Sequence, residues 1–184
     1  MTSRSTGRSH EDSLLFPTLL LRAYGLLAPL AAPVARAKFK RDLAREGVPS
    51  GRLVERMGRA TVAAPPGGRV WFHAASIGES LSILPLVEAL ADEMQILVTS
   101  GTATSGKLLA QRLPEGVIHQ FAPLDTPAAA QRFLTYWRPH VGVFVESEIW
   151  PNLMTRAIRH AGTCLLYTSP SPRDRTRSRM PSSA

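Results

Sequence analysis

The chain contains a single cysteine, Cys164, in 184 residues, which excludes a disulfide framework and a metal site built from several thiolates. His73, His119 and His140 lack the spacing of metal ligands, so we expect no metal site. The glycine- and threonine-containing loop at residues 99–105 lacks the lysine of a P-loop and the glycine spacing of a dinucleotide fingerprint. We therefore expect no cofactor.

Acidic residues are fewer than basic ones, with 14 Asp and Glu against 22 Lys and Arg and a net charge of +8. The excess belongs to the two ends, because residues 1–69 carry +7, residues 70–163 carry −2 and residues 164–184 carry +3. A nucleic-acid-binding domain would spread its basic surface across the fold, so we expect no nucleic-acid partner. The 44% of hydrophobic residues can form a core, which excludes disorder over the whole chain.

The amino-terminal part divides into a polar start at residues 1–13, expected to be disordered, and an apolar and then basic segment at residues 14–45. Its apolar stretch is long enough to span a membrane, but it contains Arg22 and prolines that would break a helix. A basic cluster follows, at Arg36, Lys38, Lys40, Arg41 and Arg45. This pattern predicts attachment to an anionic membrane surface, either spanning or lying flat. A removable signal peptide and an apolar helix packed on its own domain are the alternatives.

Residues 46–68 predict a short polar helix and a linker, and a regular alternation begins at residue 69. Apolar runs predict strands at residues 69–74, 95–99, 117–121 and 141–145, and helical spacing predicts helices at residues 81–93, 105–112, 127–137 and 151–159. Thr126 supplies an N-cap and Pro127 the first helical position. The alternation predicts an α/β fold over residues 69–163, with a Rossmann-like parallel sheet and helices on both faces.

The last segment, residues 164–184, breaks this pattern. It is rich in Ser, Pro and Arg and offers little to bury, at the point where an α/β sheet would place its next strand. A Ser/Arg-rich tail for nucleic acid is one interpretation. We favour another, in which the natural sequence stops near Cys164 and the remainder is an unrelated extension, such as the product of a frameshift.

Polar loops follow all four predicted strands: HAASIGES, TSGTATS, PLDTP and ESEIWPN. Ligands of open parallel sheets bind just outside the carboxyl ends of the strands, so these loops predict one site on one rim. Glu79 lies where a helix dipole would favour an ionised carboxylate, which could take a proton from a hydroxyl nucleophile. From spacing alone, a helix-capping acid is the favoured alternative for Glu79.

The other loops carry weaker signals. Gly101 and its neighbours could offer N–H groups and hydroxyls to an anionic group, or could form an ordinary polar turn. Asp125 is better explained as a helix-entry residue than as a catalytic one. Glu146 and Glu148 could position a sugar hydroxyl or could be solvated acids of a loop.

Several segments together resemble the 3-deoxy-D-manno-octulosonic acid (Kdo) transferases of Gram-negative bacteria. They are ERMGRA, WFHAASIGE, LVTSGTATS, FAPLDTP and RPHVGVFVESEIWPN, and the resemblance runs from about residue 24 to about residue 162 in the family's order. The combination of HAxSxGE and ESExWPN is its specific part.

The resemblance implies a two-lobed glycosyltransferase of the GT-B type, with this chain as its N-terminal, acceptor-facing lobe. Such an enzyme transfers Kdo from CMP-Kdo to a lipid A precursor in lipopolysaccharide biosynthesis. It inverts the anomeric carbon, without a covalent intermediate or a metal, at the cytoplasmic face of the inner membrane. Glu79 matches the family's proposed general base. Substrate contacts are expected from Ser76, Gly78, Ser100, Gly101, Thr102, Glu146 and Glu148.

The resemblance also implies a truncated lobe, because the donor-binding half that the family carries does not follow. We expect this chain to be inactive by itself. Two alternatives stay open at this point. One is another GT-B enzyme of lipid-linked sugars, such as a lipid A disaccharide synthase, and the other is a non-enzymatic protein that binds membranes or nucleic acid through its basic ends.

Overall fold

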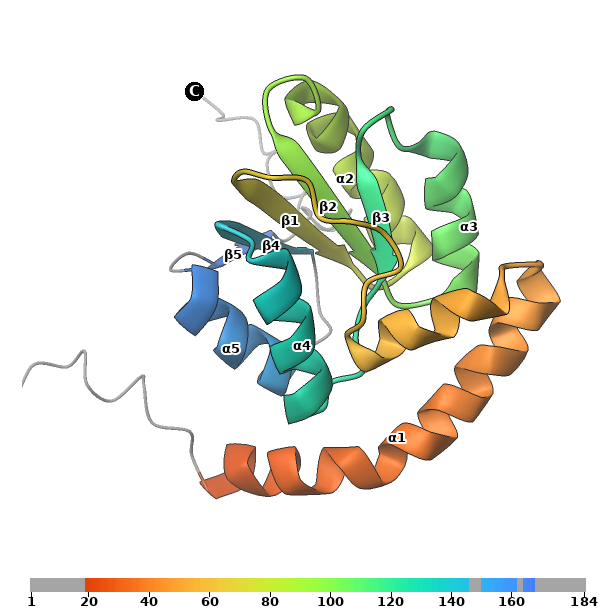
Figure 1. The fold of residues 1–184 in the computed structure, drawn as a ribbon, viewed down its shortest axis with the longest axis vertical. Coiled ribbons are helices and arrows are strands. Elements are labelled where there is room, and N and C mark those ends of the chain that lie inside the picture. Colours follow the sequence, from red (N-terminus) through yellow and green to blue (C-terminus); the bar gives the residue numbers. More distant parts are fainter. Residues whose placement is uncertain (1–18, 146–149, 162–163, 168–184) are drawn as a thin grey trace, which may run out of the picture.

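Five parallel strands form the centre of the molecule in the computed structural model, which describes residues 19–145, 150–161 and 164–167 (Figure 1). The strands are β1 (Arg69–Ala74), β2 (Gln95–Ser100), β3 (Ile118–Phe121), β4 (Val141–Val145) and β5 (Cys164–Tyr167). Their order in the sheet is β3-β2-β1-β4-β5, and every neighbouring pair is parallel. The strand order reverses between β1 and β4, as in doubly wound folds.

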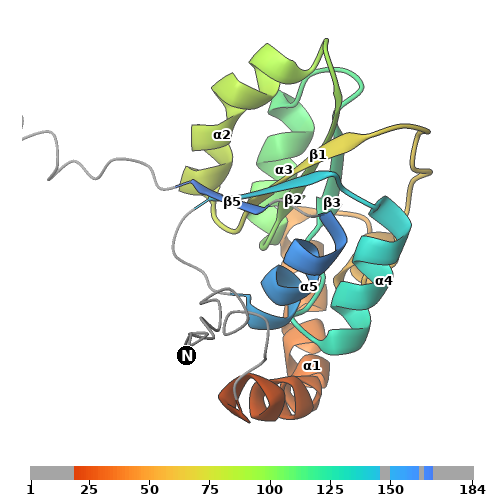
Figure 2. The same cartoon turned by 90° about the vertical axis from the view of Figure 1, so that its left-hand side faces the viewer.

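Helices cover both faces of this sheet (Figures 1 and 2). They are α2 (Ile77–Leu90) and α3 (Ala103–Arg112) on one face, and α4 (Pro127–Trp137) and α5 (Pro151–Ala161) on the other. Side chains alternate along each strand, so Phe72 packs toward α2 and α3 while Trp71 packs toward α4 and α5. The predicted Rossmann-like α/β fold is confirmed.

The predicted elements agree closely with the structure, and the differences have local causes. Helix α2 begins at Ile77, four residues before the predicted start, because Ser76 caps it. Thr126 and Pro127 open α4 as predicted. The lobe was predicted to end at residue 163, whereas Cys164–Tyr167 forms β5 and pairs with β4. The short apolar run CLLY continues the alternation by one strand.

A long helix, α1 (Leu19–Glu46), precedes the sheet and bends around one end of it (Figures 1 and 2). The expectation that prolines would break a helix here is wrong, because Pro29 and Pro33 both lie inside α1. Both are exposed and sit four residues apart, so water can satisfy the carbonyls that lose their amide partners. Among the residues that the structure describes, none of the helices has the length and hydropathy needed to cross a membrane.

A short 3₁₀-helix, η2 (Ser50–Met57), joins α1 to the sheet, as the predicted polar helix of this linker. The carboxyl-terminal half of α1 packs against it through Phe39 and Leu43, which share a small core with Leu53 and Phe121. Gly58 ends η2 with a φ of 77°. A Cβ at this position would lie 2.1 Å from the carbonyl oxygen of Ala129, so glycine is required on both conformational and steric grounds.

Candidate functional site

The turn between β1 and α2 fixes Glu79 at the carboxyl rim of the sheet. The backbone N–H of Glu79 donates to Ser76 Oγ at 3.3 Å, and Glu79 Oε2 accepts from the backbone N–H of Ala75 at 2.6 Å. This is close to a capping box, in which an N-cap hydroxyl and a glutamate three residues later satisfy the first helical N–H groups. Glu79 is therefore a helix-capping acid and, being half-buried, also a carboxylate held in one place on the rim.

The turn between β2 and α3 lies directly beside this one. Thr102 caps α3, because its Oγ1 accepts from the backbone N–H of Ser105 at 3.1 Å. The N–H of Gly101 donates to the carbonyl of Ala75 at 3.2 Å. A Cβ on Gly101 would lie 2.9 Å from that same oxygen, so a glycine lets the two turns approach. Ser76, Gly78 and Thr102 are exposed on this part of the rim.

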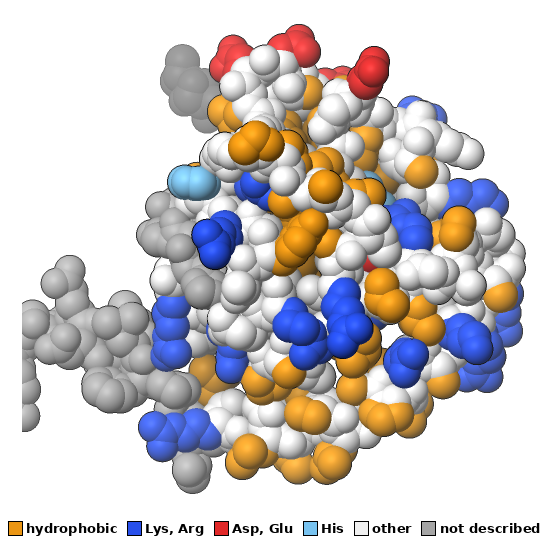
Figure 3. All heavy atoms as spheres, in the orientation of Figure 1, with side chains coloured by type: hydrophobic (Ala, Val, Ile, Leu, Met, Phe, Trp, Pro, Cys, Tyr) orange, Lys and Arg blue, Asp and Glu red, His pale blue; other side chains and the backbone are white. Residues whose placement is uncertain are grey.

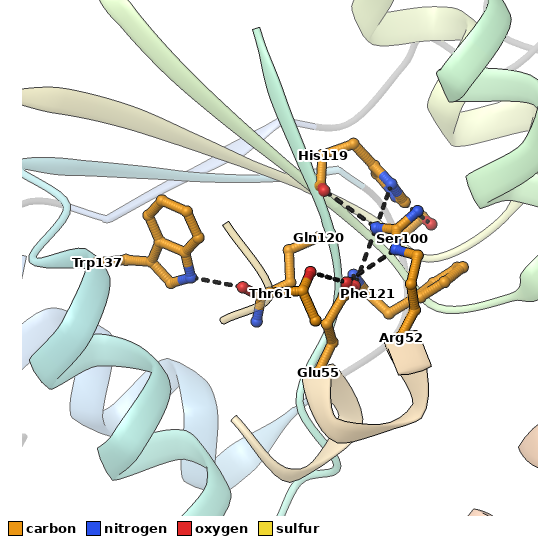
Figure 4. Close-up of polar contacts among 8 residues, drawn as sticks. All are labelled: Arg52, Glu55, Thr61, Ser100, His119, Gln120, Phe121 and Trp137. Carbon is orange, nitrogen blue, oxygen red and sulfur yellow. Dashed lines mark hydrogen bonds and ion pairs between the residues drawn. The ribbon is translucent and has the colours of Figure 1, made fainter. Parts of the chain in front are cut away.

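Ser100 differs from the other predicted contact residues, because its side chain is buried beneath the rim. Its Oγ lies 2.9 Å from His119 Nε2, and Arg52 Nη2 lies 3.0 Å from His119 Nδ1 (Figure 4). A guanidinium can only donate, so Nδ1 accepts and the Nε2 proton points to Ser100. Burial and the nearby Arg52 charge lower the pKa of His119 to about 3, so the ring is neutral.

Glu55 completes this polar cluster, in which Glu55 and Ser100 are buried and Arg52 and His119 are half-buried. The Arg52 guanidinium donates to both Glu55 oxygens, at 2.8 and 2.9 Å, and the backbone N–H of Phe121 donates to Glu55 Oε2 at 2.7 Å (Figure 4). Glu55 is fully buried. The ion pair and its hydrogen bonds compensate for that burial and fasten η2 to β3.

The next residue, Arg56, fastens the loop after β3. Its Nη1 donates to the carbonyl of Ala122 at 2.6 Å, and the N–H of Leu124 donates to the carbonyl of Arg56 at 2.8 Å. In the sequence, Glu55 and Arg56 contribute to the family resemblance through ERMGRA, and no role was predicted for either residue. The sequence signal that could have indicated an ion pair here is a glutamate flanked by Arg52 and Arg56, in a chain with few acidic residues.

Asp125 caps α5 rather than the helix that follows it in sequence. Its carboxylate accepts from the backbone N–H groups of Asn152 and Leu153, at 3.2 and 2.8 Å. It also interacts with Tyr24 of α1, and burial raises the pKa of Asp125 above its usual range. Burial, and then the Asp125 charge, raise the pKa of Tyr24 to about 12. Asp125 therefore fixes the start of α5 and not, as expected from the sequence, the start of the adjacent helix, which Thr126 caps.

His73, the first residue of HAASIGE, is buried at the end of β1. Its Nδ1 lies 2.9 Å from Thr99 Oγ1, which also accepts from Trp71 Nε1 at 2.8 Å. Desolvation, followed by the Arg56 charge, lowers the pKa of His73 to about 3. Its ring meets Trp150 edge-on with centroids 5.4 Å apart. His73 Nε2 and Trp150 Nε1 are buried without hydrogen-bond partners among the described residues.

The loop after β4 contains Glu146 and Glu148, which lie outside the described residues. In the part of the chain that the structure describes, no group of three or more His, Cys, Asp or Glu side chains could hold a metal ion. Two pockets lie along the amino-terminal half of α1. One, of about 370 Å³, includes residues of α4 and α5, and the other, of about 210 Å³, includes Leu124, Asp125 and Thr126.

A doubly wound parallel sheet, with capped turns side by side after β1 and β2, defines a Rossmann-like lobe of the α/β class. Comparison with known sequences identifies the family to which this lobe belongs. The chain belongs to the 3-deoxy-D-manno-octulosonic-acid transferase (kdotransferase) family, whose match covers residues 51–179. The match thus continues past residue 163, into the segment that the sequence analysis treated as an extension.

Individual relatives carry the same description. The chain is 41% identical over 109 residues to a probable mitochondrial 3-deoxy-D-manno-octulosonic acid transferase of Arabidopsis thaliana, over 58% of this chain and 24% of the relative. It is 40% identical over 100 residues to the Rickettsia typhi 3-deoxy-D-manno-octulosonic acid transferase, over 53% of this chain and 22% of the relative. The Haemophilus influenzae enzyme is 34% identical over 107 residues, over 56% of this chain and 25% of the relative. The chain therefore matches about a quarter of these relatives' length and belongs to a glycosyltransferase family of lipopolysaccharide biosynthesis.

Proposed function

We propose that this chain is the acceptor-binding lobe of a Kdo transferase that moves Kdo from CMP-Kdo to a lipid A precursor. Family membership supports the reaction class, and the position of Glu79 is the single observation that carries the mechanism. The carboxylate is anchored at the carboxyl rim, where ligands of parallel sheets bind. In this proposal Glu79 is the general base of an inverting transfer without a covalent intermediate.

The chemistry follows from the way Glu79 is held. The Ala75 N–H engages Oε2, so Oε1 is the oxygen that takes the proton from an acceptor hydroxyl. As that proton leaves, the hydroxyl oxygen forms a bond to the anomeric carbon of Kdo from one face. The bond from this carbon to CMP breaks on the opposite face, so the configuration inverts.

The remaining predicted residues divide between contact and support. Ser76, Gly78 and Thr102 are exposed beside Glu79, where they can contact the acceptor. Ser100 and Gly101 hold this part of the rim in place through His119 and the Ala75 carbonyl. Glu146 and Glu148 follow β4, which neighbours β1 in the sheet, and we assign them a supporting role in the same site.

The membrane side of the proposal rests on α1. We propose that this helix attaches the lobe to the cytoplasmic face of the inner membrane. Five of its large apolar side chains are strongly exposed, at Leu20, Leu26, Leu27, Leu30 and Val34. The helix also carries six basic and two acidic residues. Figure 3 shows apolar and basic side chains gathered over the α1 end of this face, with acidic side chains at the opposite end. An apolar surface beside cationic groups suits an anionic lipid leaflet.

The test is Kdo transfer by this lobe joined to a donor-binding lobe, with CMP-Kdo and a lipid A precursor as substrates. We expect Glu79→Gln to lower kcat by about a thousandfold, the range of general-base catalysis, with a small change in KM. Glu88→Gln, an exposed glutamate on the same helix, is the matched control and should keep full activity. The 184-residue chain by itself should form no product. Undiminished synthesis by Glu79→Gln would refute the assignment.

A further inference from the structure

His119 lies on β3, at one edge of the described sheet, and the proposed mechanism gives it no part in the proton transfer. Side chains of η2 meet the outward backbone groups of this strand. Arg52 Nη2 donates to the carbonyl of His119 at 3.0 Å, and Glu55 Oε2 accepts from the N–H of Phe121 at 2.7 Å (Figure 4). A residue of a neighbouring parallel strand would bond to the same two groups, a carbonyl and the N–H two residues later. The ion pair therefore takes the place of a neighbouring strand and fixes the position of His119.

The ring of His119 is also held in one orientation and one tautomer. The Arg52 guanidinium donates to Nδ1 at 3.0 Å, so the ring proton lies on Nε2, which is 2.9 Å from Ser100 Oγ (Figure 4). The ring meets Phe121 edge-on with centroids 5.2 Å apart. A Cβ on Gly106 would lie 3.1 Å from Cε1 of the ring, so α3 packs closely against its other side. His119 thus donates to Ser100 from one defined direction.

Ser100 is joined to the Glu79 carboxylate through a short stretch of backbone. It is the last residue of β2, and the N–H of the next residue, Gly101, donates to the Ala75 carbonyl at 3.2 Å. The Ala75 N–H in turn donates to Glu79 Oε2 at 2.6 Å. Both backbone polar groups of Ala75 are therefore engaged, one by the turn after β2 and the other by Glu79. Ala75 and Ser100 are buried, so water does not readily replace a contact that is lost here.

We propose that His119 is a positioning residue for Glu79. Its Nε2 proton holds Ser100, which determines where Gly101 meets Ala75, and the Ala75 peptide determines where the carboxylate lies. A reacting group has to lie within about 0.5 Å of its productive position, and a carboxylate on a turn does so only if the turn itself is held. This inference rests on the proposed function, because Glu79 is the general base there.

Two amide substitutions separate this role from a purely structural one. His119→Gln places its amide near the position of Nε2 and keeps a donor to Ser100, whereas His119→Asn places its amide near the position of Nδ1 and keeps only an acceptor for Arg52. Each variant loses one of the two ring hydrogen bonds, so we expect similar melting temperatures. Ser100→Ala removes the same contact as His119→Asn by a smaller change, and it decides the test if His119→Asn does not fold. His140→Asn, an exposed histidine just before β4, is the control.

Hydrogen exchange of the Ala75 amide in the whole chain is the first measurement, because this N–H bonds to Glu79 and its exchange reports local opening. We expect exchange to be about tenfold faster in His119→Asn and in Ser100→Ala. It should be unchanged in His119→Gln and in His140→Asn.

Kdo transfer by this lobe joined to a donor-binding lobe is the second measurement. A misplacement of about 1 Å can cost about a hundredfold in rate, so the smaller displacement in His119→Asn should lower kcat by about tenfold with little change in KM. His119→Gln should keep nearly full kcat. A variant with both His119→Asn and Ser100→Ala should lose no more than either alone, because both substitutions remove one contact.

The inference requires both responses. Equal exchange or equal kcat in His119→Gln and His119→Asn would overturn it, as would additive losses in the double variant. Such a failure leaves the transfer reaction untouched, because Glu79→Gln would still lower kcat. Conversely, an active Glu79→Gln enzyme would end the proposed function, and the exchange rates would still show whether His119 holds the turn at Ala75.

Discussion

The buried carboxylate of Glu55 accepts the backbone N–H of Phe121 at 2.7 Å, across 66 positions of the sequence. Arg52 pairs with the same carboxylate and also reaches His119, which in turn meets Ser100. A linker helix thus determines where β3 ends and where the loop after it begins. The rim of the sheet is positioned from outside the sheet.

Replacing Glu55 should be costly for stability. Glu55→Ala leaves the Phe121 N–H without its acceptor and Arg52 without its partner, so we expect the free energy of unfolding to fall by about 3 kcal/mol. Urea denaturation measures the change. Glu115→Ala, an exposed glutamate in a loop, serves as the control and should change stability by less than about 0.5 kcal/mol. Equal losses in the two variants would contradict the role given to Glu55.

Two glycines with similar backbone angles should respond differently to the same substitution. Gly47 has a φ of 67° and open space around it, whereas a Cβ on Gly58, at 77°, would meet the carbonyl oxygen of Ala129 at 2.1 Å. Gly47→Ala therefore carries only the conformational cost of about 1 kcal/mol. Gly58→Ala adds a steric clash of about 1–3 kcal/mol, so its melting temperature should be clearly the lower. Equal melting temperatures in the two variants would show that α4 can move away from the new Cβ with no loss of stability.

Stability should fall as the solution is acidified below pH 6.5, because His73 and His119 resist protonation in the folded state. His73 and His119 have a pKa of about 3 in the folded protein, against an ordinary histidine value of 6.5. Between these values the unfolded chain binds protons that the folded chain does not, so each histidine contributes a slope of about 1.4 kcal/mol per pH unit.

A variant that carries both His73→Gln and His119→Gln checks this prediction. Urea denaturation at several pH values between about 4 and 6 should show a much shallower dependence for the variant than for the unchanged protein. An unchanged slope would mean that other groups cause the acid sensitivity. The comparison concerns slopes, so a uniform loss of stability in the variant does not affect it.

The regular part of the fold could be predicted because its signals are local. Val141–Val145 is a continuous apolar run, which suits a strand covered on both faces, and Thr126 with Pro127 marks the start of a helix. The prolines of α1 were expected to break a helix, and they do not. Pro29 and Pro33 are exposed, so water can take the place of the amide donors that the carbonyls one turn earlier lose.

The candidate site could be predicted only in part, for a related reason. Glu79 could be predicted to lie at the rim because it is close in sequence to the end of the first strand. Its carboxylate does lie there, where it accepts from the Ala75 N–H. The link from Arg52 to His119 joins residues 67 positions apart, and nothing in the spacing of either residue indicates the other. Ser100 belongs to a Ser-, Thr- and Gly-rich segment of the kind that binds ligands. Its side chain is nevertheless buried, because β3 pairs alongside this end of β2.

The contact between η2 and β3 also limits the order in which the protein can fold during its synthesis. Translation releases Glu55 well before Phe121 exists, so the carboxylate stays hydrated while the first two strands emerge from the ribosome. Its desolvation must wait for β3, and the acceptor rim cannot take its final form earlier. A nascent chain halted just before Phe121 would therefore carry Glu55 without the backbone N–H that its carboxylate accepts in the folded lobe.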